Sequence, residues 1–356
     1  MNNDRIQEIL DLMEEARLDY FLISDPQSIA YCTGYYNDPH ERMFVFMISK
    51  HGNHTLFMND LFYLEHDLDV NIVWHKDGQD AIQTIVDEMH FPGRIGIDKN
   101  WASHFLLDLM KKLPDAKYIN ASPCVDLVRM KKDLQEQVLM IESSKINDAV
   151  MEEIIPFIQE GVTEKQLAKK LDELFFNHHS TCYGAIVAFG KNAADPHHEN
   201  DDTPLRKGDC VLIDMGCVYK GYCSDMTRTF FYEGILEEEI KVYEIVKKAN
   251  EAAEAMIKPG VKLSDIDKCA RKVISDEGYG KYFTHRLGHF IGRDVHEYGD
   301  VSSVNEMEVE EGMIFSIEPG IYLEGNFGVR VEDLVMVTKD GCQVLNSFTK
   351  DIYIIY

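Results

Sequence analysis

The stretch that decides the fold is LIDMGCVYKGYCSDMTRTF, residues 212–230, in which two short apolar strands flank a turn at VYKG. It places two aspartates, Asp214 and Asp225, inside segments whose other residues are suited to a core. A buried carboxylate costs several kcal/mol unless a cation or hydrogen-bond donors pair with it. A lone aspartate here would indicate a solvated hairpin edge, so the two carboxylates have to be considered together.

The two aspartates become neighbours if the stretch forms a symmetric hairpin. With a turn at Tyr219 and Lys220, residues whose numbers sum to 439 face each other, and Asp214 and Asp225 are such a pair. Directly opposed side chains have their Cβ atoms about 4.5–5.5 Å apart. Two carboxylates at this distance repel each other unless a cation lies between them. The hairpin therefore predicts a cation site.

A second stretch, FSIEPGIYLEGNFGVRVEDLVMVT at 315–338, repeats the pattern. A turn at Gly325 makes Glu318 and Glu332 face each other, unless Pro319 disturbs the register. Between the two hairpins, HRLGHFIGRDVHEYG at 285–299 carries three histidines among glycines. Four carboxylates and an imidazole suit a pair of divalent ions such as manganese, cobalt, iron or zinc. Structural zinc prefers closed cysteine and histidine sets instead.

The composition restricts the class of protein. The chain has 356 residues, 45% hydrophobic and 28% charged, which predicts two domains of a globular protein. Its formal net charge of -26 is unfavourable for binding nucleic acid or an anionic membrane. The eight cysteines form no C-x-x-C pair, which indicates reduced thiols. Without a signal-peptide core or an apolar run of ~18–20 residues, the sequence predicts a cytoplasmic protein.

The periodicity changes along the chain. Residues 1–123 alternate amphipathic helices with short apolar strands, which predicts a small α/β domain, and contain no phosphate-binding glycine loop. We expect a linker at 124–132. Residues 133–356 predict long helices, one of them begun by the capping box Thr163-x-x-Gln166, and strand-rich blocks between them. This pattern predicts an α+β second domain.

The motifs of the second domain resemble those of a known family. D-x-G-x(4)-G-Y-x-S-D-x-T-R-T from Asp214, G-H-x-I-G-x-x-x-H-E from Gly288, I-E-P-G and G-V-R-V-E-D are similar to the pita-bread metallopeptidases. That family includes methionine aminopeptidase, aminopeptidase P, prolidase and the metal-free creatinase. SDPQSIAYCTGYY at 24–36 resembles the creatinase-type N-terminal domain, so the resemblance covers essentially the whole chain. It implies an α+β pita-bread fold preceded by a small α/β creatinase-type domain.

The resemblance implies specific roles for five metal ligands. Asp214 would bind one ion, His289 and Glu318 the other, while Asp225 and Glu332 bridge them. Because all five are present, the metal-free variant of the family is disfavoured. The implied cofactor is two divalent ions, first of all manganese, with cobalt, zinc and iron as alternatives.

The implied reaction is hydrolysis of an N-terminal peptide bond by a hydroxide that bridges the ions. Glu318 would take the proton of the water and pass it to the leaving nitrogen. His197 and His296 would hydrogen-bond the substrate and the oxyanion. His198 is the second candidate for the role of His197, and His296 is alternatively a supporting partner of the metal ligands.

The compact first domain and the total length resemble a bacterial Xaa-Pro dipeptidase. The alternative is an aminopeptidase P, which removes the residue before proline from longer peptides. A third possibility is a metal-free peptide-binding module, but the presence of all five ligand residues argues against it. Either enzyme would take a small peptide with proline second.

The predicted substrate-binding residues come from both domains. A dipeptidase has to hold a free carboxylate, which a guanidinium does bidentately, and Arg293 and Arg330 lie inside the metal-site motifs. Arg330 alternatively forms an ion pair beside Glu332. Phe290 and Arg293 depart from the common G-H-G-I-G pattern and would line a substrate pocket, as would His285.

The loop NDPHER, 37–42, is by default a solvated turn. Similar prolidases are homodimers in which a loop of the first domain reaches the active site of the partner. The resemblance therefore implies a homodimer in which Asp38, His40 and Arg42 contact the substrate.

Overall fold

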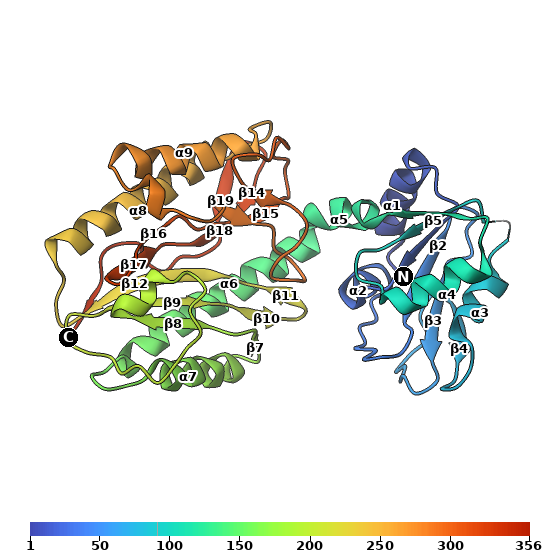
Figure 1. The fold of residues 1–356 in the computed structure, drawn as a ribbon, viewed down its shortest axis with the longest axis horizontal. Helices are drawn as coiled ribbons and strands as arrows, with labels where there is room; N and C mark the ends of the chain where they lie inside the picture. Colours follow the sequence, from blue (N-terminus) through green and yellow to red (C-terminus); the bar gives the residue numbers. More distant parts are fainter. Residues whose placement is uncertain (91) are drawn as a thin grey trace. The chain divides into compact units, whose positions relative to one another are not determined.

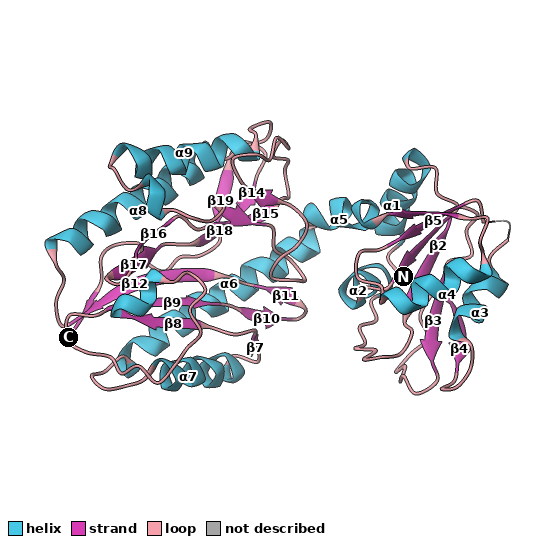
Figure 2. Ribbon diagram, viewed as in Figure 1, coloured by secondary structure: helices cyan, strands magenta, loops and turns pink. Residues whose placement is uncertain are grey.

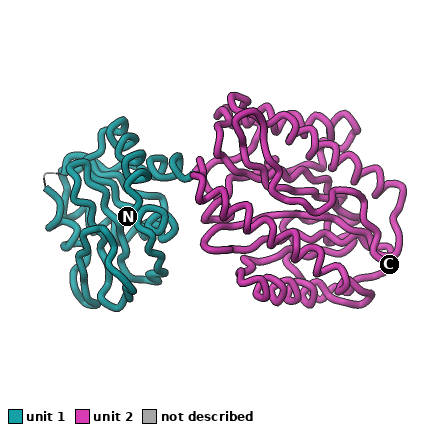
Figure 3. The backbone as a smooth tube through the Cα atoms, turned by 180° about the vertical axis from the view of Figure 1, so that it is seen from behind, with its two compact units in different colours: residues 1–129 teal, residues 130–356 magenta. Residues whose placement is uncertain are grey.

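A six-stranded mixed sheet organises residues 1–129, the first of two units in the computed structural model, which describes residues 1–90 and 92–356 (Figures 2 and 3). The strand order is β4-β3-β2-β1-β5-β6. The strands are β1 (Tyr20–Ile23), β2 (Val45–Ser49), β3 (Thr55–Asn59), β4 (Asn71–His75), β5 (Arg94–Ile97) and β6 (Lys117–Asn120).

Helices cover both faces of this sheet. Phe21 and Ile23 of β1 pack in a core cluster with residues of α1 (Asn3–Glu15), α2 (Pro26–Thr33) and α5 (Ser122–Met130). Tyr20 and Leu22 pack on the opposite face with residues of α3 (Ala81–Glu88) and α4 (Ser103–Lys112). A strand that is buried on both faces is apolar throughout, which is why YFLI and VFMIS have no alternation. The unit is the small α/β domain that the sequence predicts.

The segment expected to be a linker, 124–132, is helical over most of its length. It falls largely within α5, whose Cys124, Val125 and Val128 belong to the core of the first unit. The division between the units lies at Arg129 and Met130. Pro123 does not interrupt this helix, because proline is well tolerated in the first turn.

The second unit, 130–356, is built from mainly antiparallel strands, with β20 parallel to β12, and four long helices (Figure 1). Its largest sheet has the order β20-β12-β9-β8, and a shorter sheet has the order β11-β10-β7. The strands are β7 (Thr181–Cys182), β8 (Ile186–Phe189), β9 (Cys210–Met215), β10 (Cys217–Tyr219), β11 (Tyr222–Cys223), β12 (Met226–Tyr232) and β20 (Ile354–Ile355).

The remaining strands of this unit form three small sheets, β15-β18-β19, β16-β17 and β13-β14. Their bounds are β13 (Gly288–His289), β14 (Asp300–Val301), β15 (Ile314–Ile317), β16 (Gly320–Leu323), β17 (Phe327–Arg330), β18 (Asp333–Val337) and β19 (Cys342–Val344).

The long helices pack against these sheets (Figure 1). α6 (Leu134–Ile154) and α7 (Glu164–Asn177) pack on β8, β9 and β12 through a shared apolar cluster. α8 (Glu237–Met256) packs on β15, β16 and β17, and α9 (Leu263–Asp276) packs on α8. Short 3₁₀ helices η1 (Ile155–Phe157), η2 (Gly190–Ala194) and η3 (Gly280–Tyr282) complete the unit. The predicted capping box of α7 is confirmed, with reciprocal hydrogen bonds between Thr163 and Gln166.

The predicted register of the first hairpin is wrong by two residues. In the structure Tyr219 faces Tyr222 and Asp214 faces Thr227, so opposed residues sum to 441 rather than 439. The two turn residues, Lys220 and Gly221, both have positive φ, of 48° and 83°. Such a two-residue turn matches the twist of the flanking strands, and it shifts the centre of the hairpin by one residue. Asp214 and Asp225 are therefore diagonal rather than directly opposed.

Gly216 separates β9 from β10 at a point where no side chain fits. A Cβ there would lie 1.9 Å from the hydroxyl of Tyr183 and 2.1 Å from the carbonyl oxygen of Ser224. The space admits a 2.7 Å hydrogen bond that the Tyr183 hydroxyl donates to that carbonyl. This contact holds the strand break beside Asp225.

The predicted register of the second hairpin is confirmed on both sides of its centre. Gly320 faces Arg330 in one ladder and Ile317 faces Asp333 in the other, and both pairs sum to 650. The ladder is interrupted between these pairs, where the backbone of Glu332 instead donates a hydrogen bond to the carbonyl of Thr227. Glu318 and Glu332 thus project from the break in the hairpin.

All eight cysteines are free, as the sequence predicts. Among the residues described, none of the helices has the length and apolar character needed to cross a membrane.

Candidate metal centre

The second unit contains a cavity of about 420 Å³ on which the predicted site residues converge. Four carboxylates and one imidazole contribute to its wall: Asp214, Asp225, Glu318, Glu332 and His289. His197, His285, His296 and Arg330 line the same cavity. Nine of the predicted residues, which span more than a hundred positions of the chain, are thus brought together.

His289 presents one ring nitrogen to the carboxylates. Its Nδ1 donates a 3.2 Å hydrogen bond to the carbonyl oxygen of Phe290. In the neutral imidazole, the other ring nitrogen, Nε2, therefore carries the lone pair that can bind a cation. Nε2 lies 3.5 Å from Asp225 Oδ2 and 3.6 Å from Glu318 Oε1. Ligand atoms of Asp225, His289 and Glu332 all lie within 4.8 Å of one another.

A serine and a threonine orient the ligands. Ser316 Oγ accepts a hydrogen bond from the backbone N–H of His289 and donates one to Glu318 Oε1. The Thr227 hydroxyl donates to Glu332 Oε2 over 2.6 Å. Ser316 and Thr227, which lie outside the cavity wall, thus hold His289, Glu318 and Glu332 in place.

The crowding of carboxylates changes their protonation. Burial, with nearby carboxylates adding to it, raises the pKa of Glu318 to about 7 and that of Glu332 well above its usual range. Burial also raises the pKa of Asp214, although the charge of Arg330 opposes the change. Without cations, the protein therefore holds protons at these positions near neutral pH.

Arg330 is fully engaged by protein groups. Its Nη2 donates to Asp214 Oδ2 over 2.5 Å, its Nε donates to the Thr227 hydroxyl, and its Nη1 donates to the hydroxyl of Tyr322. The Arg330 side chain is 3% exposed, and that of Asp214 is 23% exposed. The alternative that Arg330 pairs beside Glu332 is therefore replaced by a pair with Asp214.

His285 and His296 are neutral imidazoles in this cavity. Burial is the main cause that lowers the pKa of each to about 4. His285 Nδ1 donates to the carbonyl of Arg286, and its Nε2 accepts from the Tyr322 hydroxyl over 2.8 Å. The ring of His296 lies 4.3 Å from that of His289, centroid to centroid.

The structure separates the two adjacent histidines of GKNAADPHHE. His197 lines the cavity, whereas His198 donates to the buried carboxylate of Glu164 over 2.6 Å. Glu164 also accepts from the backbone of Phe189 and Asp201. His198 thus anchors the loop that carries His197.

Several predicted substrate residues do not line the cavity. Phe290 is fully buried and packs on Phe315, with ring centroids 5.3 Å apart. The guanidinium of Arg293 lies over the ring of Tyr222 and beside Gly221.

The loop residues Asp38, His40 and Arg42 lie in the first unit, and the cavity is lined by residues of the second. Arg42 makes a bidentate pair with Asp77, with two 2.9 Å hydrogen bonds. His40 Nδ1 lies 3.7 Å from Asp38 Oδ2, and both side chains are exposed.

Sequence reasoning missed other parts of the wall, including Tyr183, Ile186, Val295 and Arg286. Ile186 and Val295 carry no signal, because apolar residues in strands and turns look like core. Arg286 lies between His285 and His289 in the motif already described, and its positive charge within that motif was the signal that could have indicated it. Tyr322 follows I-E-P-G by two residues and bonds to His285 and Arg330.

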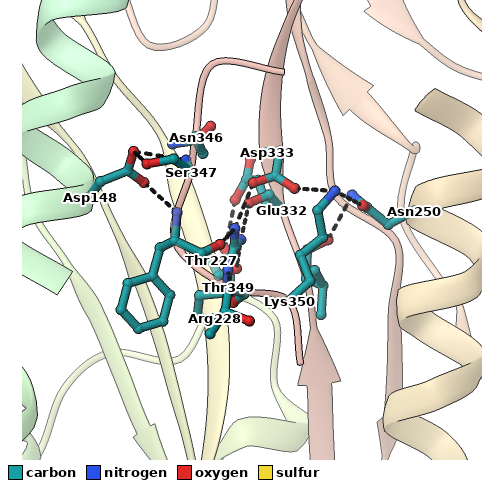
Figure 4. A network of polar contacts seen from close by, with 12 residues as sticks. Asp148, Thr227, Arg228, Asn250, Glu332, Asp333, Asn346, Ser347, Thr349 and Lys350 are labelled. Carbon is teal, nitrogen blue, oxygen red and sulfur yellow. Dashed lines mark hydrogen bonds and ion pairs between the residues drawn. The ribbon is translucent and has the colours of Figure 1, made fainter. Parts of the chain in front are cut away.

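A buried polar network supports the ligands from behind (Figure 4). Arg228 donates to the carbonyls of Thr227 and Glu332 and to Asp333 Oδ1, which is fully buried. Lys350 contacts the other oxygen of Asp333 at 2.7 Å and donates to Asn250. Although burial opposes it, Arg228 and Lys350 hold the pKa of Asp333 below its usual value.

The segment 346–350 continues this support (Figure 4). Asn346 accepts from the backbone of Leu334 and donates to the carbonyl of Asp225. Asp148 of α6 accepts from Ser347 and from the backbone of Phe348. Hydrogen bonds from this segment and from Arg228 thus reach the backbones of Asp225 and Glu332, the two ligands expected to bridge the ions.

The donor set fits divalent cations. Four carboxylates and one imidazole nitrogen are hard to borderline ligands, and no cysteine lines the cavity. The buried carboxylates are short of positive charge, since Arg330 and His289 are the basic groups in direct contact with them. The residues present therefore fit the two-ion site that the sequence predicts.

Comparisons with known proteins agree with this site. A family model described as metallopeptidase family M24 matches residues 138–339, and one described as the creatinase/prolidase N-terminal domain matches 5–131. The chain belongs to metallopeptidase family M24. M24 metallopeptidases use divalent metal ions, and the cavity provides a matching set of ligands.

The similarity extends over whole chains. An uncharacterized peptidase of Staphylococcus aureus (strain bovine RF122 / ET3-1) is 35% identical over 355 residues, which cover 97% of this chain and 99% of the relative. The crystal structure of a prolidase from Thermococcus sibiricus is 32% identical, with a TM-score of 0.93 and 99% of both chains covered. An X-Pro aminopeptidase from Thermotoga maritima is 29% identical, with a TM-score of 0.85, covering 97% of this chain and all of that one.

We predict that Lys350→Met weakens metal binding although Lys350 does not face the cavity. The substitution leaves the buried Asp333 with Arg228 alone, which frees the backbone of Glu332 to shift. Loss of a partner behind the ligands costs about 10–100-fold in metal affinity. Calorimetric titration of the chelated protein with Mn²⁺ measures this. Lys247→Met, which removes the exposed pair with Asp351, is the control, and equal affinities in the two variants would contradict the role of the network.

A second prediction concerns the metal-free protein. Because the folded-state pKa of Glu318 is raised to about 7, the folded protein binds more protons than the unfolded one, and stability falls as pH rises toward 8. Relative to wild type, Glu318→Gln should therefore gain about 2 kcal/mol in unfolding free energy between pH 5 and pH 8. Urea unfolding of both chelated proteins at pH 5 and pH 8 measures the difference. A pH-independent difference would refute the raised pKa.

Proposed function

We propose that the protein is an Xaa-Pro dipeptidase with two divalent metal ions, first of all manganese. The observation that carries the proposal is the convergence of Asp214, Asp225, His289, Glu318 and Glu332 on one cavity of about 420 Å³. A cavity of this size suits a small ligand. The similarity to a prolidase over 99% of both chains supports the choice of substrate.

The five ligand residues would hold the ions, with Asp225 and Glu332 between them. When bound, the ions supply a water of lowered pKa as the nucleophile and polarise the scissile carbonyl. Every other contribution comes from the protein. Glu318 would take a proton from the attacking water and return it to the leaving nitrogen.

The cavity histidines would position the substrate. His296, with a pKa of about 4, is neutral at physiological pH and donates a hydrogen bond without adding charge. His197 lines the same cavity and would contact the peptide together with His296. Donors aimed at the developing oxyanion stabilise the transition state.

An aminopeptidase P activity is the second candidate, which the similarity to an X-Pro aminopeptidase supports. Such an enzyme cleaves before proline in longer peptides. Turnover of Leu-Pro against Leu-Pro-Pro by the metal-loaded protein decides between the two. Faster cleavage of the tripeptide would reject the dipeptidase.

The ligand assignment predicts that Asp225→Asn abolishes activity, because a neutral amide does not bridge two cations as a carboxylate does. We expect the fold to remain and kcat/KM for Leu-Pro to fall more than about tenfold, which corresponds to ~1.4 kcal/mol. Exhaustive chelation of wild type should give the same loss, and manganese or cobalt should reverse it. Metal analysis of wild type and variant accompanies the kinetics. Full activity after chelation would reject a metal mechanism.

We also propose a homodimer formed through the first unit. Tyr36, Leu61 and Tyr63 are 54%, 66% and 77% exposed, and a hydrogen bond from Tyr35 to the carbonyl of Tyr63 brings their segments together beside the loop 37–42. Sedimentation equilibrium should give twice the 41.0 kDa mass of the chain. Tyr63→Ser should weaken the dimer, whereas Leu107→Ser, on the exposed side of α4, should not. A monomer at micromolar concentration would reject the proposal.

A further inference from the structure

A buried ion pair adjoins one of the cavity histidines. Lys132 Nζ donates a 2.8 Å hydrogen bond to Glu297 Oε2, and the two side chains are 1% and 5% exposed. Both residues belong to the second unit. Glu297 directly follows His296, which lines the cavity, whereas Lys132 and Glu297 themselves lie outside the cavity wall. The pair is thus next to the candidate site without facing it.

Lys132 is held by hydrogen bonds to both sides of its backbone. Its N–H donates to the carbonyl of Gly312 over 2.8 Å, and its carbonyl accepts from Gln137 Nε2 of α6 over 2.8 Å. Gly312 in turn donates to the carbonyl of Val337, the last residue of β18. The Lys132 ammonium therefore extends from a backbone that is attached to a helix and to a sheet.

Glu297 connects the two ends of the loop 290–297. Its Oε1 accepts a 2.9 Å hydrogen bond from the backbone N–H of Arg293, and its own N–H donates to the carbonyl of Phe290 over 2.9 Å. His296 lies within this loop, one residue before Glu297. The position of the Glu297 carboxylate therefore determines the course of the backbone that carries His296.

A buried ion pair contributes direction more than stability. Taking two charges out of water costs free energy that their attraction only offsets, so uncharged residues of similar volume are often equally stabilising. The charged pair adds geometry, because the Glu297 carboxylate accepts from the Lys132 ammonium and the Arg293 N–H at once. The space is also narrow, since a Cβ at Gly292 would lie 2.7 Å from Glu297 Oε1. The carboxylate is therefore confined to one position.

We propose that Lys132 is a positioning residue that orients His296 toward the substrate through Glu297, an inference that rests on the proposed function. His296 would donate a hydrogen bond to the oxyanion, and such a donor is effective only when its direction is fixed before the reaction. A displacement of about 1 Å, caused by a change far from the reacting atoms, lowers a rate by up to about a hundredfold. Because the oxyanion forms in the transition state, loss of this orientation should lower kcat and leave KM nearly unchanged.

The test removes both charges together, because Lys132→Met alone would leave a buried carboxylate without the ammonium. In a variant that combines Lys132→Met with Glu297→Gln, the glutamine still accepts from Arg293, so the fold and the bound metal should be retained. In the manganese-loaded protein we expect kcat for Leu-Pro to fall at least about tenfold and KM to change less than about threefold. The matched control combines Lys131→Met with Glu310→Gln, which removes an exposed ion pair one residue away, and should keep the wild-type kcat.

Two further comparisons separate positioning from general support of the site. Introduced into His296→Ala, the same pair of substitutions should lower kcat by less than about twofold more, because residues that act through one group are not additive. A full additional loss there, an unchanged kcat in the first variant, or a loss that follows the metal content would overturn the proposal. If the combined variant does not fold, Glu297→Gln alone, which keeps the side-chain volume, should show the same separation of kcat from KM.

A spectroscopic readout does not depend on turnover. The isotope-labelled ring of His296 in the zinc-loaded, diamagnetic protein gives the nuclear magnetic resonance signal that His296→Ala removes. Since the ring of His289 lies 4.3 Å away, centroid to centroid, this signal should shift in the variant without both charges and stay unchanged in the control. An unshifted signal would reject the positioning role. Absence of Leu-Pro cleavage by wild type rejects the dipeptidase, whereas a shift that depends on Lys132 and Glu297 still supports the orientation of His296 by the pair.

Discussion

The repulsion among four carboxylates in one buried cavity is the constraint on which the rest of the second unit depends. Asp225, Glu318 and Glu332 come from breaks between strands, whereas Asp214 lies within β9 and is paired with Thr227 and Ile186. All four nevertheless line one cavity. Burial there raises the pKa values of Asp214, Glu318 and Glu332.

The supporting structure follows from that repulsion. Carboxylates that repel each other stay in place only if other groups hold them. Here many of those groups hydrogen-bond to the backbone of the carboxylate residues rather than to their side chains. Arg228 donates hydrogen bonds to the backbone carbonyls of Thr227 and Glu332, and Asn346 donates one to the carbonyl of Asp225. Arg228 and Asp333 are almost completely buried, so these contacts are not weakened by water. The segment 346–350 therefore supports the candidate metal centre, although residues 346–350 lie outside the wall of the cavity.

Much of the site was predictable from sequence, because metal ligands leave carboxylates in apolar strands. The facing pair Glu318 and Glu332 followed from a register that the structure confirms. The register predicted for Asp214 and Asp225 was wrong by two residues, but the two side chains still line the same cavity. The error came from the turn, where Lys220 takes a left-handed conformation that its residue type does not suggest. The segment 124–132, which we expected to be a linker, lies largely in α5.

The choice among arginines was not predictable, because it depends on which charges are already neutralised in three dimensions. Arg293 and Arg330 lie within the metal-site motifs of the sequence, but Arg293 lies over Tyr222 and Arg330 pairs with Asp214. When all four carboxylates are ionised, pairing with Arg330 leaves the deep wall strongly negative. Such a wall attracts divalent cations, whose charge in turn removes the repulsion among the carboxylates.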